Sequence, residues 1–178
     1  CHRRENILDE YSFKKIISLL NNIENSNVIF PMGYKTQEIL NKSGILLNNN
    51  VKVLDPIGYL EFMFLLKNSK FVATDSGTVV EEACILNVPS IQMRYSTERP
   101  EVYDVKASIK FDPTKSSTNN EDILSSVNNL KRGWDNPFGD GNSSELIVSD
   151  LIELSKTNNF KKHNPSDYSF DTSRSFKE

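Results

Sequence analysis

Residues 70–93 read KFVATDSGTVVEEACILNVPSIQM, and this stretch decides the fold class. Two short runs rich in Val, Ile and Phe, at 70–74 and 88–93, flank an apolar helical pattern at 79–86. The turn at 75–78 (DSGT) separates the first run from the helix. Two strands joined through a single helix must run parallel, because only a long crossover returns the chain to the same end of the sheet. The stretch therefore predicts a strand–helix–strand unit of a parallel sheet.

The same alternation of strand and helix extends to both sides of this stretch. We expect further strands at residues 27–30, 51–54 and 107–111, and helices at residues 12–23, 35–42, 59–68, 119–130 and 143–155. The first helix carries an apolar stripe at three-and-four spacing, with Ser12 as its N-cap: Phe13, Ile16, Ile17, Leu20 and Ile23. The helix at 59–68 is apolar on most faces and is expected to be well buried.

Apolar strands joined by single helices suit a sheet that is covered on both faces. The predicted fold class is therefore α/β, a doubly wound, Rossmann-like parallel sheet of roughly half a dozen strands with right-handed crossovers. We place this domain at residues 1–156, followed at 157–178 by a polar tail without hydrophobic periodicity.

Composition excludes several classes of protein. The 178 residues carry a net charge of −3, which argues against a dedicated nucleic-acid-binding protein. No apolar run approaches the ~18 residues of a membrane-spanning helix. The two cysteines, Cys1 and Cys84, form no disulfide framework, which fits a reducing cytoplasm, and Cys84 is predicted to be a buried small side chain. Because the first residue is Cys1 and not methionine, we expect the chain to be a fragment of a longer protein.

Ligands of open parallel sheets bind at the carboxyl ends of the strands, so the loops there are the candidate sites. In the first loop, Ser76 and Gly77 open a helix and present free backbone N–H groups, a hydroxyl and the positive end of the helix dipole to a phosphate. The alternative is a plain N-cap. Glu81 and Glu82 follow one turn later, where a carboxylate would accept hydrogen bonds from ribose hydroxyls or would simply be solvated.

Two further loops lie at strand ends. Residues 94–101 (RYSTERPE) carry Arg94 and Arg99, which either bind phosphate or, as we prefer, hold the loop through ion pairs. Residues 2–6 (HRREN) would follow a strand that precedes Cys1, and His2 there is a natural acid or base unless its role is structural. No glycine-rich dinucleotide motif, Walker A loop or metal-ligand spacing is present in the sequence.

Together these loops resemble the non-hydrolysing UDP-N-acetylglucosamine 2-epimerases. The similarity rests on HRREN at 2–6, DSGT followed by EEA within 75–83, TERPE at 97–101 and PFGDG at 137–141 with Ser144 after it, and it covers about residues 1–155. The resemblance implies the C-terminal, nucleotide-binding domain of a two-domain fold like that of the B-type glycosyltransferases, with the N-terminal domain absent.

For the complete enzyme, the resemblance implies inversion at C2 of a UDP-2-acetamido sugar, such as conversion of UDP-N-acetylglucosamine to UDP-N-acetylmannosamine, for bacterial surface polysaccharides. The route is anti elimination of UDP followed by its re-addition, with no metal or other cofactor. The implied partners are the UDP-sugar and the missing N-terminal domain, without nucleic acid or membrane, and the complete enzyme is expected to be a homodimer.

The resemblance also implies roles for individual residues. It places His2 and Arg3 in the catalytic cleft, Ser76 and Gly77 at the diphosphate with Thr78 beside them, Glu82 at the ribose, Phe62 at the uracil and Arg99 along the cleft.

The sequence departs from the family pattern at three places. Thr78 replaces a usual second glycine and Val80 a usual glutamine, and residues 31–36 (PMGYKT) lack the histidine that helps to hold an activating second UDP-sugar. We therefore expect weak activation or none. Two alternatives stay open, namely the donor domain of a glycosyltransferase with the same fold, and a non-enzymatic nucleotide-binding or interaction module.

Overall fold

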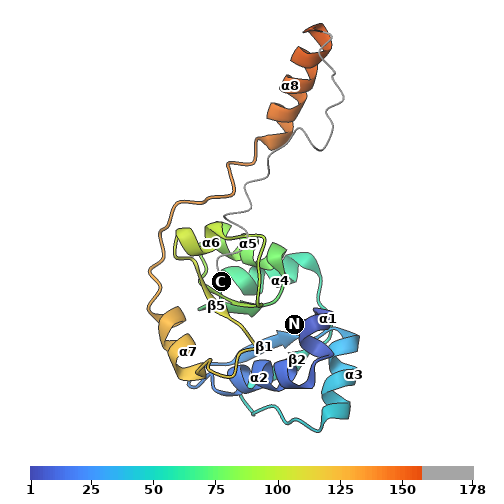
Figure 1. Ribbon diagram of the computed structural model, residues 1–178, viewed down its shortest axis with the longest axis vertical. Helices are drawn as coiled ribbons and strands as arrows, with labels where there is room; N and C mark the ends of the chain where they lie inside the picture. The colour runs from blue at the N-terminus through green and yellow to red at the C-terminus, as the bar shows by residue number, and fades with distance from the viewer. Residues whose placement is uncertain (158–178) are drawn as a thin grey trace.

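The computed structural model describes residues 1–157, which form five strands and eight helices in the described part of the chain (Figure 1). The strands are β1 (Val28–Pro31), β2 (Val51–Leu54), β3 (Val72–Thr74), β4 (Ser90–Met93) and β5 (Ser108–Phe111). The helices are α1 (Arg4–Ile7), α2 (Glu10–Asn21), α3 (Tyr34–Ser43), α4 (Tyr59–Lys67), α5 (Gly77–Ile85), α6 (Glu101–Asp104), α7 (Asn120–Asn128) and α8 (Ser143–Thr157). The predicted alternation is confirmed, and the short helices α1 and α6 are additions to it.

Every strand pair is parallel, which confirms the α/β class, but the strands form two sheets and not one. β1 pairs with β2, and β4 lies between β3 and β5. The expectation of one continuous sheet of about six strands is therefore wrong. A cavity of about 810 Å³ separates the two sheets and is lined by residues 28–31 on one side and 71–74 on the other.

Helix α2 packs against both sheets and so joins them. Ile16 and Leu19 belong to a buried cluster with residues of β4 and β5, and Phe13 and Ile17 belong to another with Phe30 of β1. The predicted apolar stripe is confirmed. The predicted N-cap is wrong, however.

Asp9 caps α2, and its Oδ2 accepts a hydrogen bond from the Ser12 backbone N–H at 2.8 Å. Asp and Ser are both good N-caps, and Asp9 occupies the position before the first helical residue, Glu10.

Two other helices differ from expectation. Helix α5 begins at Gly77 and not at residue 79, because Ser76 is its N-cap. Helix α4 is less buried than predicted: Leu66 is its buried residue, and Leu60 and Phe64 are exposed. Part of its remaining apolar surface lines the cavity between the sheets.

Helix α8 stands away from the rest of the chain (Figure 1). It buries no residue, and its exposed apolar side chains are Leu146, Ile147, Val148, Leu151, Ile152 and Leu154. Within residues 1–157 no helix is both long and apolar enough to cross a membrane. The predicted polar tail beyond Thr157 lies outside the described residues.

Candidate functional site

The turn between β3 and α5 forms one wall of the candidate site. Ser76 is the N-cap of α5, and its Oγ accepts a hydrogen bond from the Val79 N–H at 3.4 Å. Gly77 is buried, and a Cβ at this position would lie 3.3 Å from Glu98 Oε1, so the glycine leaves room that a side chain would fill. Thr78 is exposed. Free N–H groups and the positive end of the helix dipole make such a turn suited to an anion.

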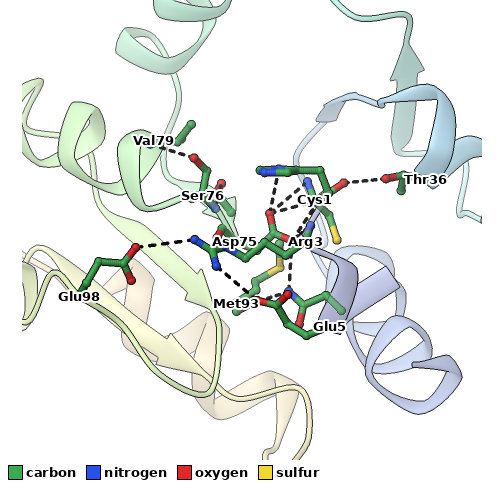
Figure 2. A network of polar contacts seen from close by, with 12 residues as sticks. Cys1, Arg3, Glu5, Thr36, Asp75, Ser76, Val79, Met93 and Glu98 are labelled. Carbon is green, nitrogen blue, oxygen red and sulfur yellow. Dashed lines mark hydrogen bonds and ion pairs between the residues drawn. The ribbon is translucent and has the colours of Figure 1, made fainter. Parts of the chain in front are cut away.

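Asp75, which precedes this turn, holds the N-terminal loop (Figure 2). Its carboxylate is completely buried and accepts hydrogen bonds from the backbone N–H groups of His2 at 3.0 Å and Arg3 at 2.9 Å. The amide of Asn6 donates to the same carboxylate at 3.2 Å and to the Met93 carbonyl at 2.9 Å. The candidate residues His2 and Arg3 therefore lie beside the Ser76 turn.

The electrostatics of Asp75 follow from these contacts. Burial opposes ionisation, but the amino group of Cys1 in the isolated chain, 3.9 Å away, and the donors on Arg3, His2 and Asn6 hold the pKa of the Asp75 carboxyl below its ordinary value. The carboxylate therefore stays charged at neutral pH. His2 Nδ1 lies 3.3 Å from Asp75 Oδ1, while most of the His2 side chain is exposed.

The loop after β4 surrounds the turn with ion pairs. Glu98 pairs with Arg94 at 2.8 Å and with Arg99 at 3.4 Å. Arg3 Nη2 lies 3.7 Å from the same carboxylate (Figure 2). Glu81 pairs closely with Arg99. These contacts agree with the ion-pair interpretation of the loop, and Arg99 also lies close to the turn, because a Cβ at Gly77 would be 3.8 Å from its Cζ.

The opposite wall comes from α4. Phe62 is half-buried and lines the same cavity as His2 and Ser76. Tyr59 donates a hydrogen bond to Glu82 at 3.1 Å, and this bond raises the pKa of the Tyr59 hydroxyl. The two adjacent glutamates therefore have different partners. Glu81 pairs with Arg99, and Glu82 accepts a hydrogen bond from Tyr59 of α4. Sequence reasoning missed Tyr59, although its position at the start of an apolar helix was a usable signal.

Other predicted features lie away from these walls. Cys84 is buried, as predicted, and burial raises the pKa of its thiol, which keeps it protonated. In the segment 31–36 that lacks the family histidine, Tyr34 and Lys35 form the start of α3; Lys35 pairs with Glu38 at 2.9 Å and Tyr34 is exposed. No cluster of residues suited to a metal ion occurs within the described part of the chain.

Comparisons with known proteins show which family this chain is similar to. The family model described as UDP-N-acetylglucosamine 2-epimerase matches residues 1–152. The UDP-N-acetylglucosamine 2-epimerase of Methanococcus maripaludis is 42% identical over 158 residues, which cover 83% of this chain and 42% of that protein. The UDP-2,3-diacetamido-2,3-dideoxy-D-glucuronate 2-epimerase of Pseudomonas aeruginosa is 31% identical, over 86% of this chain and 43% of its own length.

A solved structure is similar as well. The UDP-GlcNAc 2-epimerase of Methanocaldococcus jannaschii, crystallised with UDP-GlcNAc and UDP, superposes with a TM-score of 0.74 at 38% identity. The match covers 85% of this chain and 43% of that one. The chain therefore spans less than half the length of these relatives.

The parallel sheets and the helix N-terminus at a strand end define a Rossmann-like domain of the glycosyltransferase-B-like class. Within that class, the chain belongs to the UDP-N-acetylglucosamine 2-epimerase family. This membership favours the epimerase hypothesis over the glycosyltransferase alternative.

Proposed function

We propose that the chain is the UDP-binding domain, residues 1–156, of an enzyme that inverts C2 of a UDP-2-acetamido sugar. One observation carries the proposal: Asp75 joins His2 and Arg3 to the Ser76–Gly77 turn, and Phe62 lines the same cavity as His2 and Ser76. A nucleoside diphosphate needs these features together, namely donors for the phosphates, a flat apolar side chain for the base and a carboxylate for the ribose.

The residues of this chain would act on the UDP half of the substrate. Elimination breaks the C2–H and C1–O bonds, and UDP leaves as an anion while a C1–C2 double bond forms. The positive end of α5, the Ser76 hydroxyl and Arg3 would stabilise the charge on the departing diphosphate. Re-addition of UDP at C1 and of a proton to the opposite face of C2 completes the inversion. The carboxylates that exchange the C2 proton would come from an N-terminal domain.

Relatives about twice as long as this chain support a second domain that closes the cleft. We further propose that the complete enzyme is a homodimer that works in the cytoplasm. Without the closing domain, water would remain in the site and the catalytic groups would be incomplete. We therefore expect this chain to bind UDP weakly and to show no epimerisation alone.

Calorimetric titration with UDP tests the binding site. A hydrogen bond to a charged group contributes about 1.5–3 kcal/mol and a neutral one about 0.5–1.5 kcal/mol. Glu82→Gln should therefore weaken binding about tenfold or more, and Ser76→Ala by a smaller factor. Glu121→Gln, on the exposed first turn of α7, is the matched control and should leave affinity unchanged. Equal affinity in wild type and Glu82→Gln would remove Glu82 from the site.

Activity tests the two-domain arrangement. The C2 proton should exchange with deuterated solvent only in an enzyme that also contains the N-terminal domain. Detection of C2 epimerisation by this chain alone would contradict the proposal.

A further inference from the structure

Asp75 has no role in the chemistry proposed above, yet it is the centre of the polar network at the site (Figure 2). It does not cap the adjacent helix, because Ser76 does so. In the described part of the chain, the donors that reach its carboxylate all belong to residues 1–6. The Asp75 carboxylate is completely buried, and its hydrogen-bond donors lie 69 to 73 residues away in sequence. It therefore stabilises the N-terminal loop and not its own turn.

We propose that Asp75 is a positioning residue that orients the His2 imidazole and holds Arg3 next to the Ser76–Gly77 turn. The contacts of Asp75 with residues 2–6 do not depend on the proposed function. The expected effect on turnover does rest on the proposed function.

The orientation of His2 follows from the chemistry of the two groups. An ionised carboxylate only accepts hydrogen bonds, and His2 Nδ1 lies 3.3 Å from Asp75 Oδ1, so this contact favours the tautomer with the ring proton on Nδ1. Nε2 is then the nitrogen with a free lone pair, and the ring is 67% exposed and available to a ligand. One buried carboxylate thus selects the tautomer as well as the direction of the ring, as carboxylates do for histidines in metal sites.

Arg3 is fixed by both the side chain and the main chain of Asp75. Its backbone N–H donates to Asp75 Oδ2 and its Nε–H donates to the Asp75 carbonyl, each at 2.9 Å. These two bonds direct the guanidinium toward Glu98, whose Oε1 is the atom nearest to a Cβ at Gly77. Asn6 extends the attachment to β4 through the Met93 carbonyl. Residue 75 therefore sets where the cationic loop lies relative to the turn.

The substitution Asp75→Asn tests the orientation of His2 directly. The asparagine keeps the size of the side chain but replaces one accepting oxygen with an NH₂ donor. A donor facing Nδ1 favours the opposite tautomer, with the proton on Nε2, as in serine proteases whose triad aspartate becomes asparagine.

We expect ¹⁵N NMR at about pH 8, where free imidazole is neutral, to show His2 protonated at Nδ1 in wild type and at Nε2 in Asp75→Asn. His163, the only other histidine in the sequence, should give the same signals in both proteins. The matched control is Asp112→Asn. Asp112 is also buried and also follows a strand, but its carboxylate accepts from Thr114 and not from the N-terminal loop.

A wild-type spectrum in which His2 is protonated at Nε2 would overturn the proposal. This result does not depend on whether any variant folds. An unchanged His2 tautomer in folded Asp75→Asn would also overturn it.

Kinetics of the longer enzyme that contains this segment test the effect on turnover. Loss of a carboxylate that orients a functional histidine lowers activity about tenfold to a hundredfold in comparable sites. We expect that loss in kcat, with little change in KM or in the affinity of the chain for UDP, whereas Asp112→Asn should retain both. A loss confined to KM would show that Asp75 only supports the binding turn. Failure of wild type to bind UDP would contradict the proposed function and leave the His2 tautomer result intact.

Discussion

The two sheets of the molecule differ in how completely their strands are buried. In the three-stranded sheet, every residue of β4 is buried, and its neighbours β3 and β5 pair with it on both sides. In the two-stranded sheet, Val51 is the buried residue of β2 and the rest of that strand is exposed. A two-stranded ribbon is marginal in water without a covering element. The comparison teaches that the smaller sheet depends on what packs against it.

The N-terminal segment supplies that support. Helix α2 contributes side chains to the buried clusters of both sheets. The loop before it is hydrogen-bonded to Asp75, which follows β3, and to Thr36 of α3, which follows β1. The segment that carries the candidate catalytic residues is therefore also the one that joins the two halves. Four substitutions test how the two sheets depend on the segments that contact them.

The largest effect is expected for Phe13→Ala. Phe13 is fully buried against Phe30 and Met32, and truncation of such a side chain costs about 3–5 kcal/mol of the free energy of unfolding. Urea unfolding measures the loss, and hydrogen exchange should show β1 amides losing more protection than β4 amides. Leu60→Ala, at a residue that is 77% exposed, is the control and should be nearly neutral. Equal loss of protection in both sheets would show that they unfold as one unit.

Asp75→Asn should follow, at about 1.5–3 kcal/mol near neutral pH. Because the pKa of Asp75 is below its ordinary 3.8 in the folded state, the unfolded chain binds more protons as the pH falls. This stabilisation is complete above the ordinary pKa and is lost as the pH falls through the lower folded pKa. The difference between wild type and variant should therefore shrink below about pH 3.8. A difference that is independent of pH would rule out the charge as its source.

A smaller effect is expected in the three-stranded sheet for Tyr103→Phe. The Tyr103 hydroxyl donates to the buried Gln92 of β4, so its removal should cost about 1–2 kcal/mol. Burial raises the pKa of Tyr103 from 10.0 to about 12, so the unfolded chain loses this proton first. Wild-type stability should fall between pH 10 and 12, and Tyr103→Phe should lack that part of the decline. Parallel alkaline profiles would contradict this assignment.

Thr36→Val tests the smallest contact between the halves. Thr36 Oγ1 donates to the Cys1 carbonyl at 2.8 Å, and the valine keeps the shape while it removes the donor. We expect a loss of about 0.5–1.5 kcal/mol by thermal unfolding. Thr118→Val removes a longer bond of 3.4 Å, to Asp112 in the other half, and should cost less. The reverse order would show that the N-terminal loop does not depend on α3.

Local patterns in the sequence predicted most of the elements. Val72–Met93 forms the strand, helix and strand that its apolar runs indicate, and Gly44 ends α3 in a left-handed conformation. The N-cap of α2 was misassigned because Asp9 and Ser12 are both suitable caps one turn apart. The burial of α4 was overestimated because an apolar pattern does not say whether a facing element is present.

The candidate site was predicted through its loops and not through its contacts. Ser76 and Gly77 lie at a helix N-terminus, as the turn indicates. No local pattern shows that Asp75 binds residues 2–6, because that pairing arises only when the chain folds. The same holds for Glu81 and Glu82, which are adjacent in sequence and yet have different partners, Arg99 and Tyr59.

The division of the sheet has a consequence for how the chain behaves at high concentration. Each open sheet ends in two strands with unpaired backbone groups on one side, so two sheets present four such edges where a single sheet would present two. Edges of this kind recruit strands from other molecules. The edges here are only three or four residues long, which limits the ladder that a neighbour can form. The open sides of β1 and β3 face each other across the cavity, so the outer edges at β2 and β5 are the ones that a neighbour can reach. Colloidal stability of the isolated chain should therefore depend most on β2, where Val53 and Leu54 are exposed.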